Sequence, residues 1–257
     1  MSNYYFLAAS LPPLELDQRP ELSFEELTSR LAINLNREDF EKTVVLRRLI
    51  DLYNIRALFL GESVDSRGNM NEKELDEALL IHNILPSYVF DFLDRFEQTS
   101  DKILNFPGLI ATFFNQEIPK RTGFLRRYLE FERGWRLVLT ALRSKELGRD
   151  VAKELQFEDF SDLLVAQILA QKDAPSYDPP PAYFELKEQL ASCGPDPWQR
   201  QKVLAAWRFN AIEELVDKPL FSIDWILAYM ARLIIVEYWK ELDEKKGRLI
   251  LEQFKTG

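Results

Sequence analysis

Charged and amide side chains stand inside two strongly apolar stretches of the sequence, where they could bind a partner or brace the fold. The set comprises Asp51, Asn54 and Arg56 in the first stretch and Glu132, Arg133 and Arg136 in the second. A charge that is buried without a partner is costly, because it loses its hydration. We therefore expect these groups to pair and to lock neighbouring helices together. A surface that faces a partner protein is the alternative interpretation.

A second feature is KRTGFLRRY at 120–128, the densest basic cluster in a chain whose net charge is -9. Arg126 and Arg127 lie between the aromatic residues Phe124 and Tyr128. The cluster is short and the surrounding sequence is acidic, whereas nucleic-acid binding depends on many cations that displace counterions from phosphates. We interpret the cluster as a salt-bridged or protein-contact surface, and we expect no nucleic-acid partner.

Motifs for metal, nucleotide and nucleophilic chemistry are missing from the sequence. One histidine, His82, and one cysteine, Cys193, cannot supply a zinc site of the usual type. The segment 65–76 imitates a calcium loop, but Arg67 and Met70 stand where a ligand and a glycine are needed. No Gly-rich phosphate loop and no G-x-S-x-G occurs. We expect no catalytic residue, metal or cofactor, and the roles of His82 and Cys193 stay open.

The composition favours helices. The chain has 257 residues, of which 46% are hydrophobic and 29% charged, with only nine glycines. Such values are typical of a globular domain, and the abundant leucine, glutamate, arginine and alanine lose little side-chain freedom in helices. An all-α fold is the prediction. A single cysteine predicts a reducing compartment, the cytoplasm.

The apolar opening MSNYYFLAASLPPLEL raises the question of a signal or an anchor. The first basic residue is Arg19, after the apolar run, so the pattern does not fit a secretion signal. The run is also too short for a bilayer span of about 20 residues. We expect the segment to belong to the fold, with no direct insertion into the membrane.

Residue patterns typical of helix N-caps occur at several places in the sequence. Ser23 with Glu26 and Asn71 with Glu74 have the capping-box spacing, and Asn36 is a plausible cap of a helix that ends near Gly61. The predicted helices that follow lie at about 72–85, with His82 half inside the core, and at 87–96, 100–105, 107–116, 123–147, 161–172, 182–192 and 196–216. Ser222 is predicted to cap a long final helix that is too often interrupted by charges to span a membrane.

A proline-rich stretch, APSYDPPPAY at 174–183, divides the chain in this interpretation. Consecutive prolines lack backbone donors and favour an extended conformation. We predict N-terminal helical lobes over 1–173, a linker over 174–183 and a C-terminal helical lobe over 184–257.

Several segments resemble, in order and across nearly the whole chain, a bacterial family of unassigned activity that is similar to the C subunits of V/A-type ATP synthases. They include YYFLAASLPPL, IDLYNIRAL, LPSYVFDFL, FERGWRLVLTALRSKELGRD and FSIDWILAYMARLIIVEYW. Asp51, Asn54 and Ile55 match the acidic residue and the Asn-Ile pair of a first helical repeat. Leu142, Arg143, Lys145, Leu147 and Gly148 match a second repeat, although Trp135 stands where that repeat has its asparagine.

The resemblance implies repeated helical lobes, shortened relative to the full three-lobed cup of the V/A-type C subunits. It also implies a non-catalytic rotor protein that couples the central stalk to the membrane rotor ring of a V-type ATPase. Such a protein would be cytoplasmic and peripheral at the inner face of the membrane through its protein partners. The alternative function is a helical scaffold or adaptor that binds other soluble proteins through the basic cluster.

Overall fold

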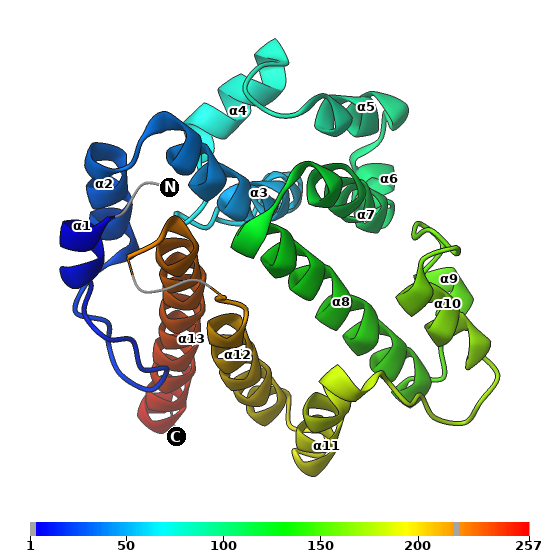
Figure 1. Cartoon of the computed structure of the whole chain (residues 1–257). Coiled ribbons are helices and arrows are strands. Elements are labelled where there is room, and N and C mark those ends of the chain that lie inside the picture. Colours follow the sequence, from blue (N-terminus) through cyan, green and yellow to red (C-terminus); the bar gives the residue numbers. More distant parts are fainter. Residues whose placement is uncertain (1–3, 218–220, 257) are drawn as a thin grey trace. The chain divides into compact units, whose positions relative to one another are not determined.

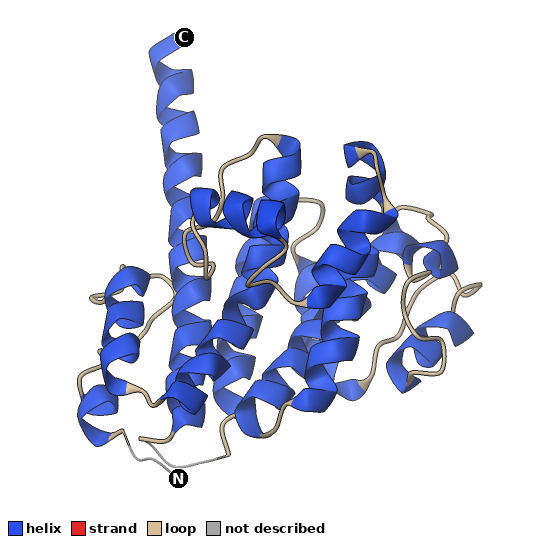
Figure 2. Ribbon diagram, turned by 90° about the horizontal axis from the view of Figure 1, so that it is seen from above, coloured by secondary structure: helices blue, strands red, loops and turns tan. Residues whose placement is uncertain are grey.

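The computed structural model describes residues 4–217 and 221–256, with side chains up to Asp243, and every regular element in these ranges is helical. Figure 2 accordingly shows helices and loops without strands in the described part of the chain. The all-α prediction is confirmed for these residues. The chain divides into two compact units. The first unit comprises 1–43 and 188–257, and the second comprises 44–187.

The helices, labelled in Figure 1, follow the predicted order closely. They are α1 (Tyr5–Ala9), α2 (Phe24–Asn34), α3 (Arg37–Leu60), α4 (Glu72–Ile81), α5 (Ser87–Arg95), α6 (Thr99–Leu104), α7 (Phe106–Glu117), α8 (Gly123–Glu146), α9 (Val151–Glu154), α10 (Leu163–Ala170), α11 (Phe184–Ser192), α12 (Pro197–Glu214) and α13 (Ile223–Thr256). Two short 3-10 turns, Ile118–Lys120 and Pro181–Tyr183, precede α8 and α11. The short helix α9 has no counterpart among the predictions.

The predicted caps are confirmed because each satisfies a backbone N–H that a helix start leaves without a partner. Ser23 and Asn71 each form a complete capping box with the glutamate three residues on. The Asn36 side chain accepts from the N–H of Asp39 at 2.9 Å, and the Ser222 hydroxyl accepts from the N–H of Trp225 at 3.3 Å. These ends of the helices are therefore fixed by local chemistry.

In the first unit, α13 packs against α12 and α2 through an apolar first half that includes the fully buried Ile226 and Leu233. The charges in this half attach α13 to its neighbours. The Arg232 guanidinium lies 3.9 Å from the ring centre of Phe209 on α12, and it pairs with Glu213, also on α12, at 3.2 Å. Glu237 accepts from the N–H of Phe24, at the positive end of α2, at 2.7 Å. No described helix has an apolar stretch that could cross a bilayer.

In the second unit, α8 is the helix against which α7, α9 and α10 pack, and α5 and α6 pack in turn on α7. The buried residues of α8 include Phe124, Leu129 and Val138, and α7 contributes Phe113 and Phe114. Leu129 and Val138 lie on opposite sides of α8, so this helix is buried on more than one side, as expected for a central helix with neighbours around it.

The proline-rich segment 174–183 lies against α8 within the second unit. Tyr177 is only 1% exposed, and Lys145 Nζ on α8 donates to a backbone carbonyl of the segment at 2.7 Å. Gln171 and Asp178 exchange two further hydrogen bonds, at 2.9 and 3.0 Å. The predicted lobes over 1–173 and 184–257 with a linker over 174–183 stay a prediction, and the two compact units have other boundaries, after Thr43 and after Lys187.

The prediction that His82 stands at a helix end, half inside the core, is right about the helix end and wrong about the burial. The residue ends α4 in the left-handed conformation with φ 51°, and it is exposed. Its ring stacks on Phe90 at 4.6 Å. The left-handed turn directs the side chain off the helix face that carries Leu75 and Ala78, which is why the helical spacing misplaced it.

Candidate functional site

A pocket of about 420 Å³ opens in the second unit between α3, α7, α8 and the segment 154–158. We call it the α3–α8 pocket. Its walls are aromatic, with Tyr53, Phe106, Trp135 and Phe157, and its polar groups are three arginines, Arg56, Arg136 and Arg143, together with Glu154 and Glu158. Aromatic walls with a few polar groups are the usual lining of a binding pocket.

Helical spacing places these residues. Tyr53 and Arg56 are three positions apart on α3, so both point to the same side of that helix. On α8, Arg136, Thr140 and Arg143 succeed one another at four and three positions and share a face in the same way. The Tyr53 ring meets the Phe106 ring of α7 at 5.7 Å between centres, which joins the walls.

Arg136 is held firmly at the pocket wall. Its guanidinium lies 4.2 Å from the ring centre of Trp135, a cation–π contact, and it forms an ion pair with the buried Glu132 one turn earlier. Burial alone would lower the pKa of Arg136, but the charge of Glu132 and a hydrogen bond with Tyr53 raise it instead. Arg136 therefore stays charged, and its charge is already matched by Glu132.

Arg56 differs from its neighbours in the pocket. It is half-buried, yet it makes no hydrogen bond or ion pair with any side chain of the described ranges 4–217 and 221–243. Our expectation that all of these groups pair is therefore wrong for Arg56. The apolar surroundings of Arg56 in the sequence did not show that no carboxylate lies across from it.

The opposite wall of the pocket is acidic. Glu158 pairs with Arg133 of α8 at 2.7 Å, and Arg133 also pairs with Asp162 at 2.8 Å. Burial would lower the pKa of Arg133, but these two carboxylates raise it. Glu154 lies 3.6 Å from Arg149. The two glutamates of the lining, Glu154 and Glu158, thus each have an arginine partner from outside the lining.

The predicted pair Asp51 and Asn54 faces another part of the second unit and braces a loop. Asp51 accepts from the N–H and from the side-chain amide of Asn69, both at 2.6 Å. Asn54 donates to the carbonyl of Asp65 at 2.9 Å and accepts from its N–H at 2.8 Å. Gly68 lies so close that a Cβ there would stand 2.7 Å from Asp51 Oδ1. Their role is structural, since all four bonds stay within the fold.

Two arginines of the basic cluster 120–128, Arg121 and Arg126, form ion pairs within the fold. Arg121 pairs with the buried Glu117, which also pairs with Arg48 of α3 at 3.0 Å. Arg126 and Glu130 form a surface pair at 2.8 Å, with side chains 54% and 46% exposed. Arg127, by contrast, is half-buried. The cluster thus contains salt bridges, as one of the two predicted interpretations requires.

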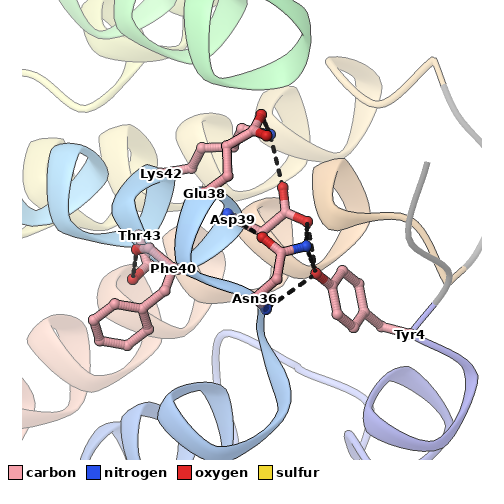
Figure 3. Close-up of polar contacts among 7 residues, drawn as sticks. All are labelled: Tyr4, Asn36, Glu38, Asp39, Phe40, Lys42 and Thr43. Carbon is pink, nitrogen blue, oxygen red and sulfur yellow. Dashed lines mark hydrogen bonds and ion pairs between the residues drawn. The ribbon is translucent and has the colours of Figure 1, made fainter.

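A further polar cluster, absent from our sequence interpretation, lies in the first unit (Figure 3). The Tyr4 hydroxyl donates to Asp39 Oδ2 at 2.6 Å, and Lys42 Nζ donates to Asp39 Oδ1 at 2.7 Å. Asn36 Nδ2 donates to both Tyr4 Oη, at 2.9 Å, and Asp39 Oδ2, at 3.0 Å. The cluster fixes Tyr4 to the first turn of α3, and Leu7, Leu11 and Leu14 are buried, so the described part of the opening packs within the fold as expected.

The residues that sequence reasoning missed were within reach of a simple extension. Tyr53 lies three positions before Arg56, and Phe106 begins α7. The sequence did not show which residues of other helices these side chains would face.

Within the described side chains, no group of three or more His, Cys, Asp and Glu residues is placed to hold a metal ion. The arrangement can instead bind a group that offers negative charge to Arg56 and an apolar surface to the aromatic walls.

This chain belongs to the family described as "Protein of unknown function (DUF2764)", whose model matches residues 1–257. It is 28% identical over 263 residues to an uncharacterized protein of Chlamydia muridarum and 27% identical to one of Chlamydia trachomatis. A third such protein, of Chlamydia pneumoniae, is 28% identical. Each similarity covers 100% of this chain and 99% of the relative. No solved structure matches the chain.

Proposed function

We propose that this protein is a non-catalytic component of a V-type ATP synthase or ATPase that couples the central stalk to the membrane rotor ring. In this proposal it is cytoplasmic and reaches the inner face of the membrane through its protein partners. The resemblance of the segments 46–61, 129–148 and 226–237 to the C subunits of V/A-type enzymes supports it. These three segments lie mainly in the longest helices, α3, α8 and α13.

The observation that carries the proposal is that polar side chains of α3 and α8, which contain two of these segments, are hydrogen-bonded or ion-paired within the fold. Asp51 and Asn54 of α3 are tied to the loop 65–69, and Glu132 and Arg136 of α8 are tied to each other. Fully partnered polar groups fix one geometry and resist deformation. A protein that passes torque between partners needs such stiffness, together with broad surfaces for contact.

The experiment that tests the proposal is recovery of the assembly. An affinity-tagged copy of the chain, expressed together with all components of a V-type ATPase from the same cell, is purified in a mild detergent. We expect the stalk proteins and the ring to co-purify in fixed ratio. Recovery of the tagged chain without any of these components, from cells in which the ATPase itself assembles, contradicts the proposal.

A helical adaptor for other soluble proteins is the second candidate, and the exposure of Arg126 favours it. The Arg126–Glu130 pair lies at the surface, so a partner's carboxylate could compete for the guanidinium. Charge reversal of Arg126 and Arg127 to glutamate is then expected to abolish capture of that partner and to leave ATPase coupling unchanged. Loss of both together argues against the adaptor.

A further inference from the structure

We propose that the α3–α8 pocket receives a single carboxylate side chain, flanked by apolar residues, from a partner protein. This inference rests on the proposed function, in which the chain works by binding other proteins, and it names the chemistry of one contact. The pocket belongs entirely to the second unit and is lined by residues of α3, α7, α8 and the segment 154–158.

Arg56 supplies the attraction. A half-buried guanidinium has lost part of its hydration, and no side chain of the described ranges compensates it. Other arginines of this unit, Arg48, Arg133 and Arg136, each reach a carboxylate within the fold. A carboxylate that enters the pocket would complete the same pairing for Arg56 with two charge-assisted hydrogen bonds.

The walls define what accompanies the carboxylate. Tyr53, Phe106, Trp135 and Phe157 present aromatic surface, and a volume of about 420 Å³ suits one or two side chains better than a folded element. Large apolar side chains next to the carboxylate would bury surface against these rings. The partner segment is therefore an acidic residue between apolar ones, as on the face of an amphipathic helix.

The charges of the lining match an occupant with one carboxylate. Glu154 and Glu158 line the pocket, Arg136 already pairs with Glu132, and Arg56 makes no ion pair within the described side chains. A nucleotide or inorganic polyphosphate would bring several negative charges beside Glu154 and Glu158, whereas one carboxylate matches the single charge of Arg56. This charge match favours a protein side chain over phosphate chemistry.

The direct test is a binding titration with a defined probe. The probe is an acetylated and amidated peptide, Leu-Phe-Glu-Leu-Leu, titrated into the full chain by calorimetry, and its control has glutamine in place of glutamate. We expect the glutamate peptide to bind about tenfold more tightly than the glutamine peptide, because the charged hydrogen bonds to Arg56 are lost in the control. Equal affinities, or tighter binding of triphosphate than of the glutamate peptide, overturn the proposal.

Matched variants assign the effect to the pocket. Arg56→Met removes the charge at similar length and is expected to weaken the glutamate peptide about tenfold while leaving the glutamine peptide unchanged. Arg126→Met removes an exposed arginine outside the pocket and is expected to change neither. If Arg56→Met does not fold, Arg56→Lys keeps the charge and must retain preference for the glutamate peptide. An unchanged preference in Arg56→Met contradicts the inference.

The failure of this inference is distinguishable from the failure of the proposed function. If the unaltered chain recovers the rotor proteins and Arg56→Met recovers them equally, the function stands and the pocket is not the contact. If the unaltered chain recovers no rotor protein but binds the glutamate peptide selectively, the pocket chemistry stands and the function is wrong.

Discussion

Asp39 and Asp51 are two buried aspartates on the same helix, α3, and their surroundings shift their pKa values in opposite directions. Asp39 is 6% exposed and belongs to the first unit, and Asp51 is 2% exposed and belongs to the second. The pKa of Asp39 lies below the usual value of an aspartate and the pKa of Asp51 lies above it. Burial alone would have raised the pKa of both.

The difference comes from the partners. Burial would raise the pKa of Asp39, but hydrogen bonds from Lys42 and Tyr4, together with the charge of Lys42, outweigh it. Burial of Asp51 is deeper and dominates, because its donors are the uncharged groups of Asn69. Arg47 is the cation that acts on Asp51, but its Nη1 donates to the carbonyl of Gly68.

The comparison teaches how the two units use polar groups. In the first unit a hydrogen bond from the Tyr4 hydroxyl to Asp39 anchors Tyr4 to α3, and the ion pair of Asp39 with Lys42 of the same helix favours the charged carboxylate. In the second unit amide donors fix a loop to the side of α3, and the carboxylate is retained for its geometry at a cost in desolvation. Four predictions test this contrast.

The largest effect is expected for Gly68→Ala. The new Cβ would stand 2.7 Å from Asp51 Oδ1 and 2.8 Å from Asn54 Nδ2, so the loop must move off α3 and its hydrogen bonds are lost. We expect a loss of about 3 kcal/mol in the free energy of unfolding, measured with urea. Gly61→Ala is the control: it meets no atom within 4 Å but has φ +69°, so only about 1 kcal/mol of backbone strain is expected. Equal losses for both variants contradict the account of Asp51.

Lys42→Met should make Asp39 resemble Asp51. It removes the ammonium that donates to Asp39 Oδ1 at 2.7 Å and leaves the neutral donors Tyr4 and Asn36 in place. We expect a loss of about 1–2 kcal/mol at pH 7 and a rise in the pKa of Asp39, followed by NMR of the carboxyl carbon. A pKa that stays unchanged would show that Tyr4 and Asn36 suffice to keep the carboxylate ionised.

The two aspartates should also give stability profiles of opposite slope with pH. For Asp39, whose pKa is lowered on folding, the stabilising contribution is complete above about pH 3.9 and is lost as pH falls through the folded pKa. For Asp51, whose pKa is raised, stability falls as pH rises from about 3.9 through the folded pKa. Urea unfolding of the unaltered chain, Asp39→Asn and Asp51→Asn between about pH 3 and pH 7 isolates each slope. Slopes of the same sign for both positions contradict the contrast.

The smallest effect is expected for Arg126→Ala. The Arg126–Glu130 pair is exposed on both sides, so water and salt screen it, unlike the pairs of Asp39 and Glu132. We expect a loss of only a few tenths of a kcal/mol, which disappears at about 1 M salt. A loss above about 1 kcal/mol would show that the basic cluster braces the fold more strongly than its exposure suggests.

Helix positions and starts were predictable because the chemistry that sets them is local. A cap such as Ser23 or Asn71 acts on N–H groups within three residues, so the pattern can be read directly from the chain. The polar residues of α3 were also identifiable, because a charge or amide in an apolar helix stands out. The partners of these residues could not be identified from the sequence. The same holds for α8, where Arg133 pairs with Glu158 and Asp162, which lie 25 and 29 positions away in the chain.

By itself, then, the sequence determined an all-helical fold, the ends of most helices and the set of side chains that must find partners on burial. Only the tertiary structure decided which of them found a partner from another element: Asp39 received the Tyr4 hydroxyl in addition to Lys42 of its own helix, Asp51 received the amides of Asn69, and Arg56 received no partner among the described side chains. The reason is physical. Helix periodicity and capping depend on neighbours in the chain, whereas the charge balance of a buried group depends on the elements that packing brings against it.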